Sequence, residues 1–153
     1  MRKEVSELKF VRLIVDGSAV GNPGFGGWAC IMKHGTRERV LTGSEPESTN
    51  NRMEMIAALR GLQALKEPCK VEVVTDSEYL QRGMTELVAK WKVNGWRASS
   101  GKPVLNRELW IELESAAAPH EVSWKWIPGR EAEEPDHNRA DSLARQAAMA
   151  GGA

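Results

Sequence analysis

Apolar residues along the chain fall into short runs that predict five strands. The first three runs follow one another at short turns, which is typical of an antiparallel meander, and a loop at 44–49 ends them. The fourth run is continuously apolar, as in a strand that is buried on both faces of a sheet. The fifth alternates Val122, Trp124 and Trp126 with polar residues. The predicted strands span residues 10–15, 26–33, 38–43, 71–75 and 121–127.

Helical periodicity predicts the elements between and after the later strands. Met55, Leu59 and Leu62 form an apolar stripe on the first helix. Asn106 precedes another helix, whose first free backbone amides its side chain can cap. The resulting order predicts an α/β protein with a five-stranded mixed sheet (an antiparallel meander plus parallel strands) flanked by helices. The predicted helices span residues 51–65, 77–84 with an extension toward Trp91, 107–117 and 135–148.

Length and composition fit one globular domain. The 153 residues carry 21 Lys and Arg and 21 Asp and Glu, and this zero net charge argues against bulk nucleic-acid binding. No apolar stretch approaches the roughly 20 residues of a membrane span. Cys30 and Cys69 have no metal-ligand spacing, so we expect a reduced, cytoplasmic protein. Separately, we expect the protein to be a monomer. We expect a single domain over residues 1–153, with an N-terminal extension at 1–9 and a frayed tail at 150–153.

Four acidic residues occupy positions where a charge is costly. Asp16 and Asp76 each follow an apolar strand, and the carboxyl ends of parallel strands meet at the ligand-binding edge of α/β sheets. Glu54 lies on a helical stripe with small residues that let the helix approach the sheet. Asp141 lies among the alanines of the last helix. One such acid is more often a turn former or a cap, but four on converging elements indicate a cation site.

The chemistry of these four side chains restricts the cation. Hard oxygen ligands with no histidine or cysteine beside them select magnesium or manganese over zinc. Two such ions about 3.5–4 Å apart can activate a water and stabilise the leaving oxygen of a phosphodiester. The acids therefore predict metal-dependent phosphoryl transfer.

Five motifs follow one another along the chain: DGS at 16–18, GNPG at 21–24, TNNRME at 49–54, TDS at 75–77 and NRAD at 138–141. Together they resemble bacterial type 1 ribonuclease H, and the similarity runs from about residue 10 to residue 149. The resemblance implies an endonuclease that hydrolyses the RNA strand of an RNA–DNA hybrid and leaves 5′-phosphate and 3′-hydroxyl ends. It also implies two Mg²⁺ ions, with Mn²⁺ as a substitute. Asp16 would bridge both ions, Glu54 and Asp76 would bind one, and Asp141 the other.

The same resemblance implies contacts with the hybrid. Asparagines would read the minor groove, where 2′-hydroxyls distinguish RNA from DNA, and two further residues would bind a phosphate of the DNA strand. Turn and cap chemistry is the alternative explanation for the asparagines. The implied groove contacts are Asn22, Asn50 and Asn51, and the implied phosphate contacts are Thr49 and Asn106.

Residues 87–107 resemble the basic handle of the family, because they contain five Lys and Arg residues and no acid. Lys92, with Trp91 and Trp96 beside it, is assigned to substrate binding, since such a strip neutralises phosphates. We expect both tryptophans mainly to hold the handle together. The alternative to a substrate-binding handle is a solvated loop in which the two tryptophans only anchor the segment by packing. The handle is less basic than is usual in the family, which predicts a raised KM.

The loop before the last helix departs from the family pattern. Arg130 stands where a histidine assists proton transfer or product release in family members, and an arginine cannot take up a proton at neutral pH. We hypothesise that Glu131 or Glu133 partly covers that role by orienting water or recruiting an ion. His137 is the nearest histidine in the sequence, and we expect it to be an exposed first-turn residue.

Two other functions remain open at this point. A catalytically silent hybrid-binding module of the same fold would gain nothing from clustered negative charge near phosphates. Another nuclease or recombinase of the fold, such as a junction resolvase or a transposase core, would lack the TNNRME context and the handle with its tryptophans. The sequence therefore favours the hydrolase.

Overall fold

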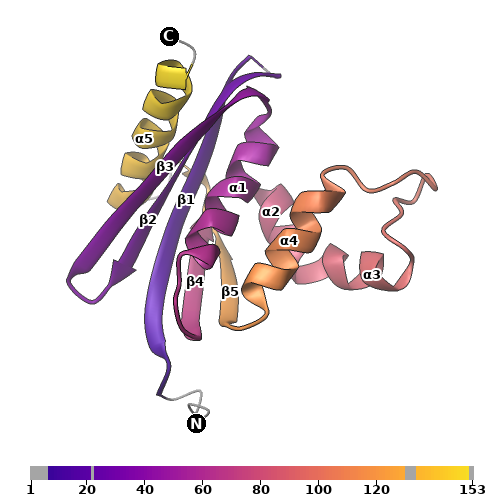
Figure 1. The fold of residues 1–153 in the computed structure, drawn as a ribbon, viewed down its shortest axis with the longest axis horizontal. Helices are drawn as coiled ribbons and strands as arrows, with labels where there is room; N and C mark the ends of the chain where they lie inside the picture. Colours follow the sequence, from indigo (N-terminus) through magenta and orange to yellow (C-terminus); the bar gives the residue numbers. More distant parts are fainter. Residues whose placement is uncertain (1–6, 22, 130–133, 152–153) are drawn as a thin grey trace.

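A five-stranded mixed sheet forms the centre of the protein (Figure 1). The computed structural model describes residues 7–21, 23–129 and 134–151. The order across the sheet is β3-β2-β1-β4-β5, in which β1, β2 and β3 pair antiparallel while β1, β4 and β5 pair parallel. This arrangement confirms the predicted α/β class. The strands are β1 (Lys9–Gly21), β2 (Gly24–His34), β3 (Arg37–Ser48), β4 (Cys69–Thr75) and β5 (Glu121–Trp126).

Helices cover both faces of the sheet (Figure 1). On one face α1 and α4 enclose the larger core, which includes Leu13, Leu59 and Trp110, all at most 1 % exposed. On the other face α5 packs against β1 and β2, and Ala140 meets Ile14 there. The helices are α1 (Asn50–Gln63), α2 (Glu78–Arg82), α3 (Val88–Val93), α4 (Arg107–Ala117) and α5 (Pro135–Gly151), with a π-helical turn η2 (Gly83–Leu87) between α2 and α3.

Helix α1 lies unusually close to the sheet, as its small residues predicted. A Cβ added at Gly61 would lie 2.7 Å from Sγ of Cys30 and 3.1 Å from Cδ1 of Leu13. Only a residue without a side chain fits that distance. The close approach brings the second turn of α1, with Glu54, toward β1.

Strand β1 is longer than its apolar run, and this length creates the site. We expected the strand to end before Asp16, but it continues to Gly21 because β2 pairs with it throughout, as far as Gly24. Its parallel pairing with β4 stops at Ile14 opposite Val74. Beyond that point no strand in the described part of the chain pairs with β1 on the side of β4. We call this part of β1, residues 15–21, the overhang, and Asp16 lies on it.

Three other element boundaries differ from those predicted. The expected loop at 44–49 belongs largely to β3. This is an edge strand, where a proline such as Pro46 is tolerated. The residues of η2 show no apolar periodicity that indicates a π-helical turn, so this turn was not predicted. Residue 150 and Gly151 are helical in α5, so the predicted frayed tail was wrong there, while residues 152–153 lie outside the described residues. Among the described helices, none is long and apolar enough to cross a membrane.

Candidate active site

The space beside the overhang of β1 is a pocket of about 410 Å³ that all four predicted acids line. Asp16 comes from β1, Glu54 from the second turn of α1, Asp76 from the residue after β4, and Asp141 from α5. Four elements far apart in sequence thus bring their carboxyl groups to one cavity, as the sequence predicted. Asp16 and Glu54 are 3 % and 5 % exposed, whereas Asp76 is half-buried.

Glu54 is held in place by hydrogen bonds to both of its carboxyl oxygens. The backbone N–H of Gly17 donates to Oε1 at 3.0 Å, and the hydroxyl of Thr75 donates to Oε2 at 3.0 Å. Gly17 must be a glycine here, because an added Cβ would lie 2.5 Å from the backbone nitrogen of Glu54. The residue after the first aspartate therefore sets the distance between β1 and the second acid.

Burial makes it costly to ionise two of these acids together. It raises the pKa of Asp16 to about 7 and raises the pKa of Glu54 well above its ordinary value. A hydrogen bond between the two carboxyl groups lowers the pKa of Asp16 and raises that of Glu54. The nearby charges of Asp76 and Asp141 raise the pKa of Asp16 further. Such a cluster has the electrostatic character of a cation site.

Asp76 and Asp141 are positioned by neighbouring side chains. The indole N–H of Trp126 donates to the backbone oxygen of Asp76 at 3.0 Å and fixes the chain just after β4. On α5, Arg145 lies one turn after Asp141 and its guanidinium contacts Oδ2 at 3.2 Å. Arg145 therefore brings a positive charge to the wall of the pocket.

His137 also belongs to this site, and the prediction that it is an exposed first-turn residue was wrong. It is 2 % exposed, and its Nε2 lies 3.7 Å from Oδ2 of Asp76 and 3.9 Å from Oδ1 of Asp16. The signal for it was present in the sequence, because residues four apart on a helix share a face and His137 lies four residues before Asp141. The prediction also assumed that no histidine accompanies the acids, whereas His137 lies beside two of them.

The donor set fits a divalent ion. One atom each from Asp16, Asp76 and His137 lie within 4.8 Å of one another. The buried carboxyls of Asp16 and Glu54 become easier to ionise when a cation stands beside them. Carboxylate oxygens suit Mg²⁺ and Mn²⁺, and one imidazole nitrogen is compatible with a transition ion.

Comparison with known proteins assigns the chain to one family. The family model for RNase H matches residues 9–149. The chain belongs to the RNase H family. It is 48% identical over 141 residues to "Ribonuclease H" of Bradyrhizobium sp. (strain ORS 278), covering 92% of this chain and 91% of that protein. It is 51% identical over 136 residues to "Ribonuclease H" of Halorhodospira halophila (strain DSM 244 / SL1), covering 89% and 91%. The resemblance to bacterial type 1 enzymes is thereby confirmed.

Solved structures share the RNase H fold. LC9-RNase H1, described as a type 1 RNase H with the type 2 active-site motif, aligns with a TM-score of 0.84 and 30% identity over 94% of this chain and 74% of that one. LC11-RNase H1 in complex with RNA/DNA hybrid aligns with a TM-score of 0.73 and 23% identity over 94% and 99%. The second similarity concerns the fold alone.

In this RNase H a second cavity, of about 560 Å³, adjoins the acidic pocket. Asn50 and Asn51 line both cavities, and the amide oxygen of Asn50 accepts the N–H of Ala19 at 2.7 Å. Thr49 and Asn106 line the second cavity only. The structure thus brings together four of the residues to which the resemblance assigned substrate contacts.

Asn106 precedes α4 in a way that differs from the predicted cap. Its φ is +58°, and its side chain makes no capping hydrogen bond. The amide instead donates to the hydroxyl of Tyr79 at 3.1 Å. Asparagine tolerates the left-handed region better than most residues do, so the sequence signal was right about the boundary and wrong about the mechanism.

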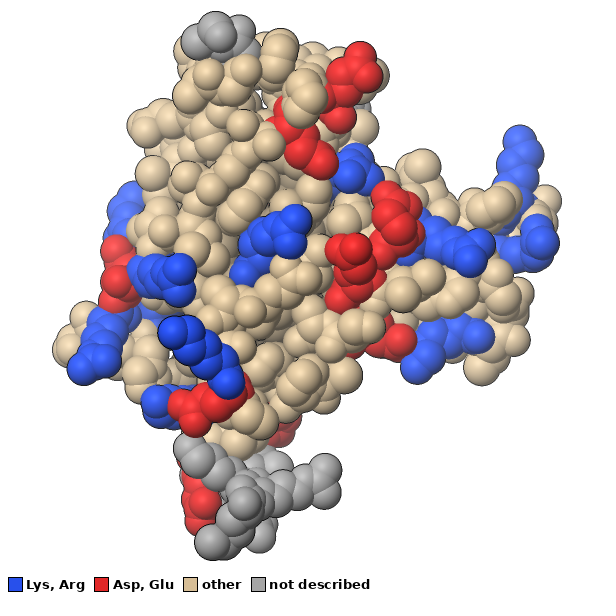
Figure 2. Space-filling view, in the orientation of Figure 1, with Lys and Arg blue, Asp and Glu red and all other residues tan. Residues whose placement is uncertain are grey.

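The handle of this RNase H is organised around its tryptophans, as expected. The ring of Trp91 lies 6.2 Å from that of Trp96 and 5.6 Å from that of Trp110 in α4. Figure 2 shows Lys and Arg side chains gathered at the right of the molecule, over the segment between α3 and α4. The charge of Lys92 is already paired within the protein, because its Nζ lies 3.0 Å from a carboxylate oxygen of Glu114.

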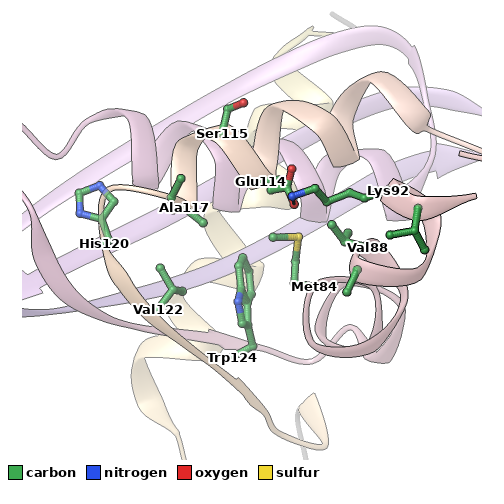
Figure 3. A pocket seen from close by; sticks show the side chains of 12 residues that line it. Met84, Val88, Lys92, Glu114, Ser115, Ala117, His120, Val122 and Trp124 are labelled. Atoms are coloured by element: carbon green, nitrogen blue, oxygen red, sulfur yellow. Dashed lines mark ion pairs between the residues drawn. The ribbon is translucent and has the colours of Figure 1, made fainter. Parts of the chain in front are cut away.

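Figure 3 shows that Lys92 and Glu114 lie at the wall of a different cavity, of about 690 Å³, between α3, α4 and β5. Met84, Val122 and Trp124 give this cavity an apolar lining, and none of the four acids belongs to it. It is therefore not the site of the predicted chemistry. Four residues named from the sequence, Asn22, Arg130, Glu131 and Glu133, lie outside the described residues.

Proposed function

We propose that this RNase H hydrolyses the RNA strand of RNA–DNA hybrids with two divalent ions, Mg²⁺ or Mn²⁺, and leaves 5′-phosphate and 3′-hydroxyl ends. The observation that carries the proposal is the buried pair Asp16 and Glu54, which shares one pocket with Asp76 and Asp141. A module that only bound the hybrid would lose affinity by presenting these charges to phosphates. The fold similarity to LC11-RNase H1, whose structure is a complex with RNA/DNA hybrid, supports the substrate class.

Each acid has a distinct task in this proposal. Asp16 would be shared by both ions, Glu54 and Asp76 would hold one, and Asp141 would hold the other. Bound ions would supply an activated water and a charge that stabilises the leaving oxygen. Glu54 stays oriented through the N–H of Gly17 and the hydroxyl of Thr75, so its carboxylate needs no rearrangement before it binds.

The second cavity positions the hybrid. Asn50 and Asn51 lie between the acids and this cavity, where they contact 2′-hydroxyls in the minor groove. Asn22 joins them in that role. Thr49 and Asn106 hold a phosphate of the DNA strand on the far side.

The handle adds affinity for the hybrid that does not depend on the base sequence of the hybrid. Lys92, Trp91 and Trp96 lie on the segment that contacts the backbone of the hybrid, with the tryptophans giving it a fixed shape. We assign the protein a single domain that acts as a cytoplasmic monomer, and the burial of both its cysteines is in keeping with a reducing compartment.

The loop with Arg130 lacks the histidine of other family members, and Glu131 or Glu133 partly covers its role by orienting water. If Glu131→Ala and Glu133→Ala both keep the full kcat, this part of the proposal is wrong. The metal chemistry itself does not depend on it.

Cleavage of a labelled hybrid about 12 base pairs long tests the function directly. Strands are followed with Mg²⁺, with Mn²⁺ and with chelator, beside RNA and DNA duplexes of the same sequence. Hybrid-only, metal-dependent cleavage that disappears in Asp16→Asn is expected. Asp136→Asn is the matched control, because that acid lies on α5 but pairs outward with Lys33 at 2.7 Å. Binding of the hybrid without cleavage in either ion would favour the silent module.

A further inference from the structure

His137 places an imidazole ring beside two acids of the pocket, Asp16 and Asp76. Its ring is 2 % exposed, and neither ring nitrogen has a hydrogen-bond partner among residues 7–21, 23–129 and 134–151. A buried polar group without a partner costs about 1–3 kcal/mol. A side chain in this state is expected to bind something in the functional protein.

The distances indicate what that partner is. At 3.7 Å from Asp76 and 3.9 Å from Asp16, Nε2 of His137 is too far for a direct hydrogen bond to either carboxylate. Ligands that share one ion at about 2.1 Å stand about 3.0–3.5 Å apart, so the imidazole needs to move less than roughly 1 Å toward each carboxylate. All three donor atoms already lie within 4.8 Å of one another.

We propose that Nε2 of His137 is a direct ligand of the ion held by Asp16 and Asp76, and that it makes this site prefer first-row transition ions over Mg²⁺. The inference rests on the proposed function, since it takes the acids to be metal ligands. Imidazole nitrogen binds transition ions better than it binds Mg²⁺, which keeps oxygen ligands and water.

A neutral ligand also suits the electrostatics of this pocket. A further carboxylate would add repulsion to a group of acids in which burial already raises the pKa of Asp16 and Glu54. An imidazole adds a strong donor without adding negative charge. His137 lies on α5, the helix that also supplies Asp141, so one helix brings two donor side chains to the site.

Spectroscopy of the Mn²⁺-loaded protein tests this assignment without reference to turnover. Electron spin echo measurements detect the modulation that a directly bound histidine nitrogen produces. We expect that modulation in the parent protein, its loss in His137→Asn and His137→Gln, and its retention in His34→Asn. The matched control His34 is exposed at the end of β2, and its Nδ1 contacts the backbone oxygen of Phe10 at 2.9 Å.

Calorimetric titration of metal-free protein supplies the second measurement. His137→Asn should raise the Kd for Mn²⁺ by about tenfold or more and that for Mg²⁺ by less than about threefold. Mn²⁺ bound without nitrogen modulation, or bound equally by parent and both variants, overturns the role of His137 and leaves the acids as ligands. If the parent binds neither ion, the proposed function fails as well.

Discussion

Removal of one buried charge should stabilise this protein in the absence of metal. The change is Asp16→Asn, which keeps the shape of a side chain that is 3 % exposed and removes its ionisation. Burial, followed by the charges of Asp76 and Asp141, raises the pKa of Asp16 from 3.8 to about 7. Ionised Asp16 therefore opposes folding, and its replacement should raise the free energy of unfolding.

The size of the gain depends on pH in a defined direction. Because the folded protein binds the proton of Asp16 more tightly than the unfolded chain does, stability is lost as pH rises from about 4 to about 7. The full difference corresponds to roughly 4 kcal/mol at pH 8. Asparagine remains a buried polar group, so we expect a net gain of about 2–4 kcal/mol, or a rise in Tm of roughly 5–15 °C.

Thermal unfolding followed by circular dichroism, with chelator at pH 5 and pH 8, measures this gain. Asp136→Asn is the control, because its carboxylate is paired with Lys33 and its loss should lower Tm or leave it unchanged. Divalent ions should stabilise the parent more than Asp16→Asn. A Tm for Asp16→Asn that is unchanged or lower at pH 8, or a gain of equal size at both pH values, would refute the reasoning.

Three further predictions concern packing and substrate affinity. Gly17→Ala should lower the free energy of unfolding by about 1–3 kcal/mol in denaturant titrations, because its Cβ would lie 2.5 Å from the backbone nitrogen of Glu54; a stability equal to the parent's would contradict that contact. The KM for hybrid should exceed that of a lysine-rich family member in the same salt, and equal values would show that the handle's charge does not limit binding. Glu114→Gln should free Lys92 and steepen the salt dependence of hybrid affinity by about one counterion, while an unchanged slope would show that the pair with Glu114 does not restrain it.

The sequence predicted the sheet because its inner strands are set by local patterns. The apolar run before Asp76 and the meander of β1, β2 and β3 require no knowledge of distant residues. The continuation of β1 past Asp16 and of β3 past Gly43 could not be predicted in the same way. Both extensions are polar or glycine-rich, and pairing with β2 rather than residue preference keeps them extended.

The site was predictable to the extent that its residues violate the usual burial rules. Asp16, Glu54, Asp76 and Asp141 stand out because charges interrupt apolar patterns, and the structure places all four in one pocket. His137 does not stand out, since a histidine in a first helical turn next to polar neighbours is ordinary. Its burial is caused by the overhang of β1 and the start of α5, two elements that meet only in the folded protein.

The position of α5 also has a consequence for protein synthesis. Asp141 and His137 lie on α5, which follows every strand of the sheet along the chain and packs against β1 and β2, the first two strands. A nascent chain that has folded only as far as β5 therefore presents three of the four acids and neither contribution of α5. Nuclease activity should consequently begin only after α5 has been synthesised and has docked on the sheet.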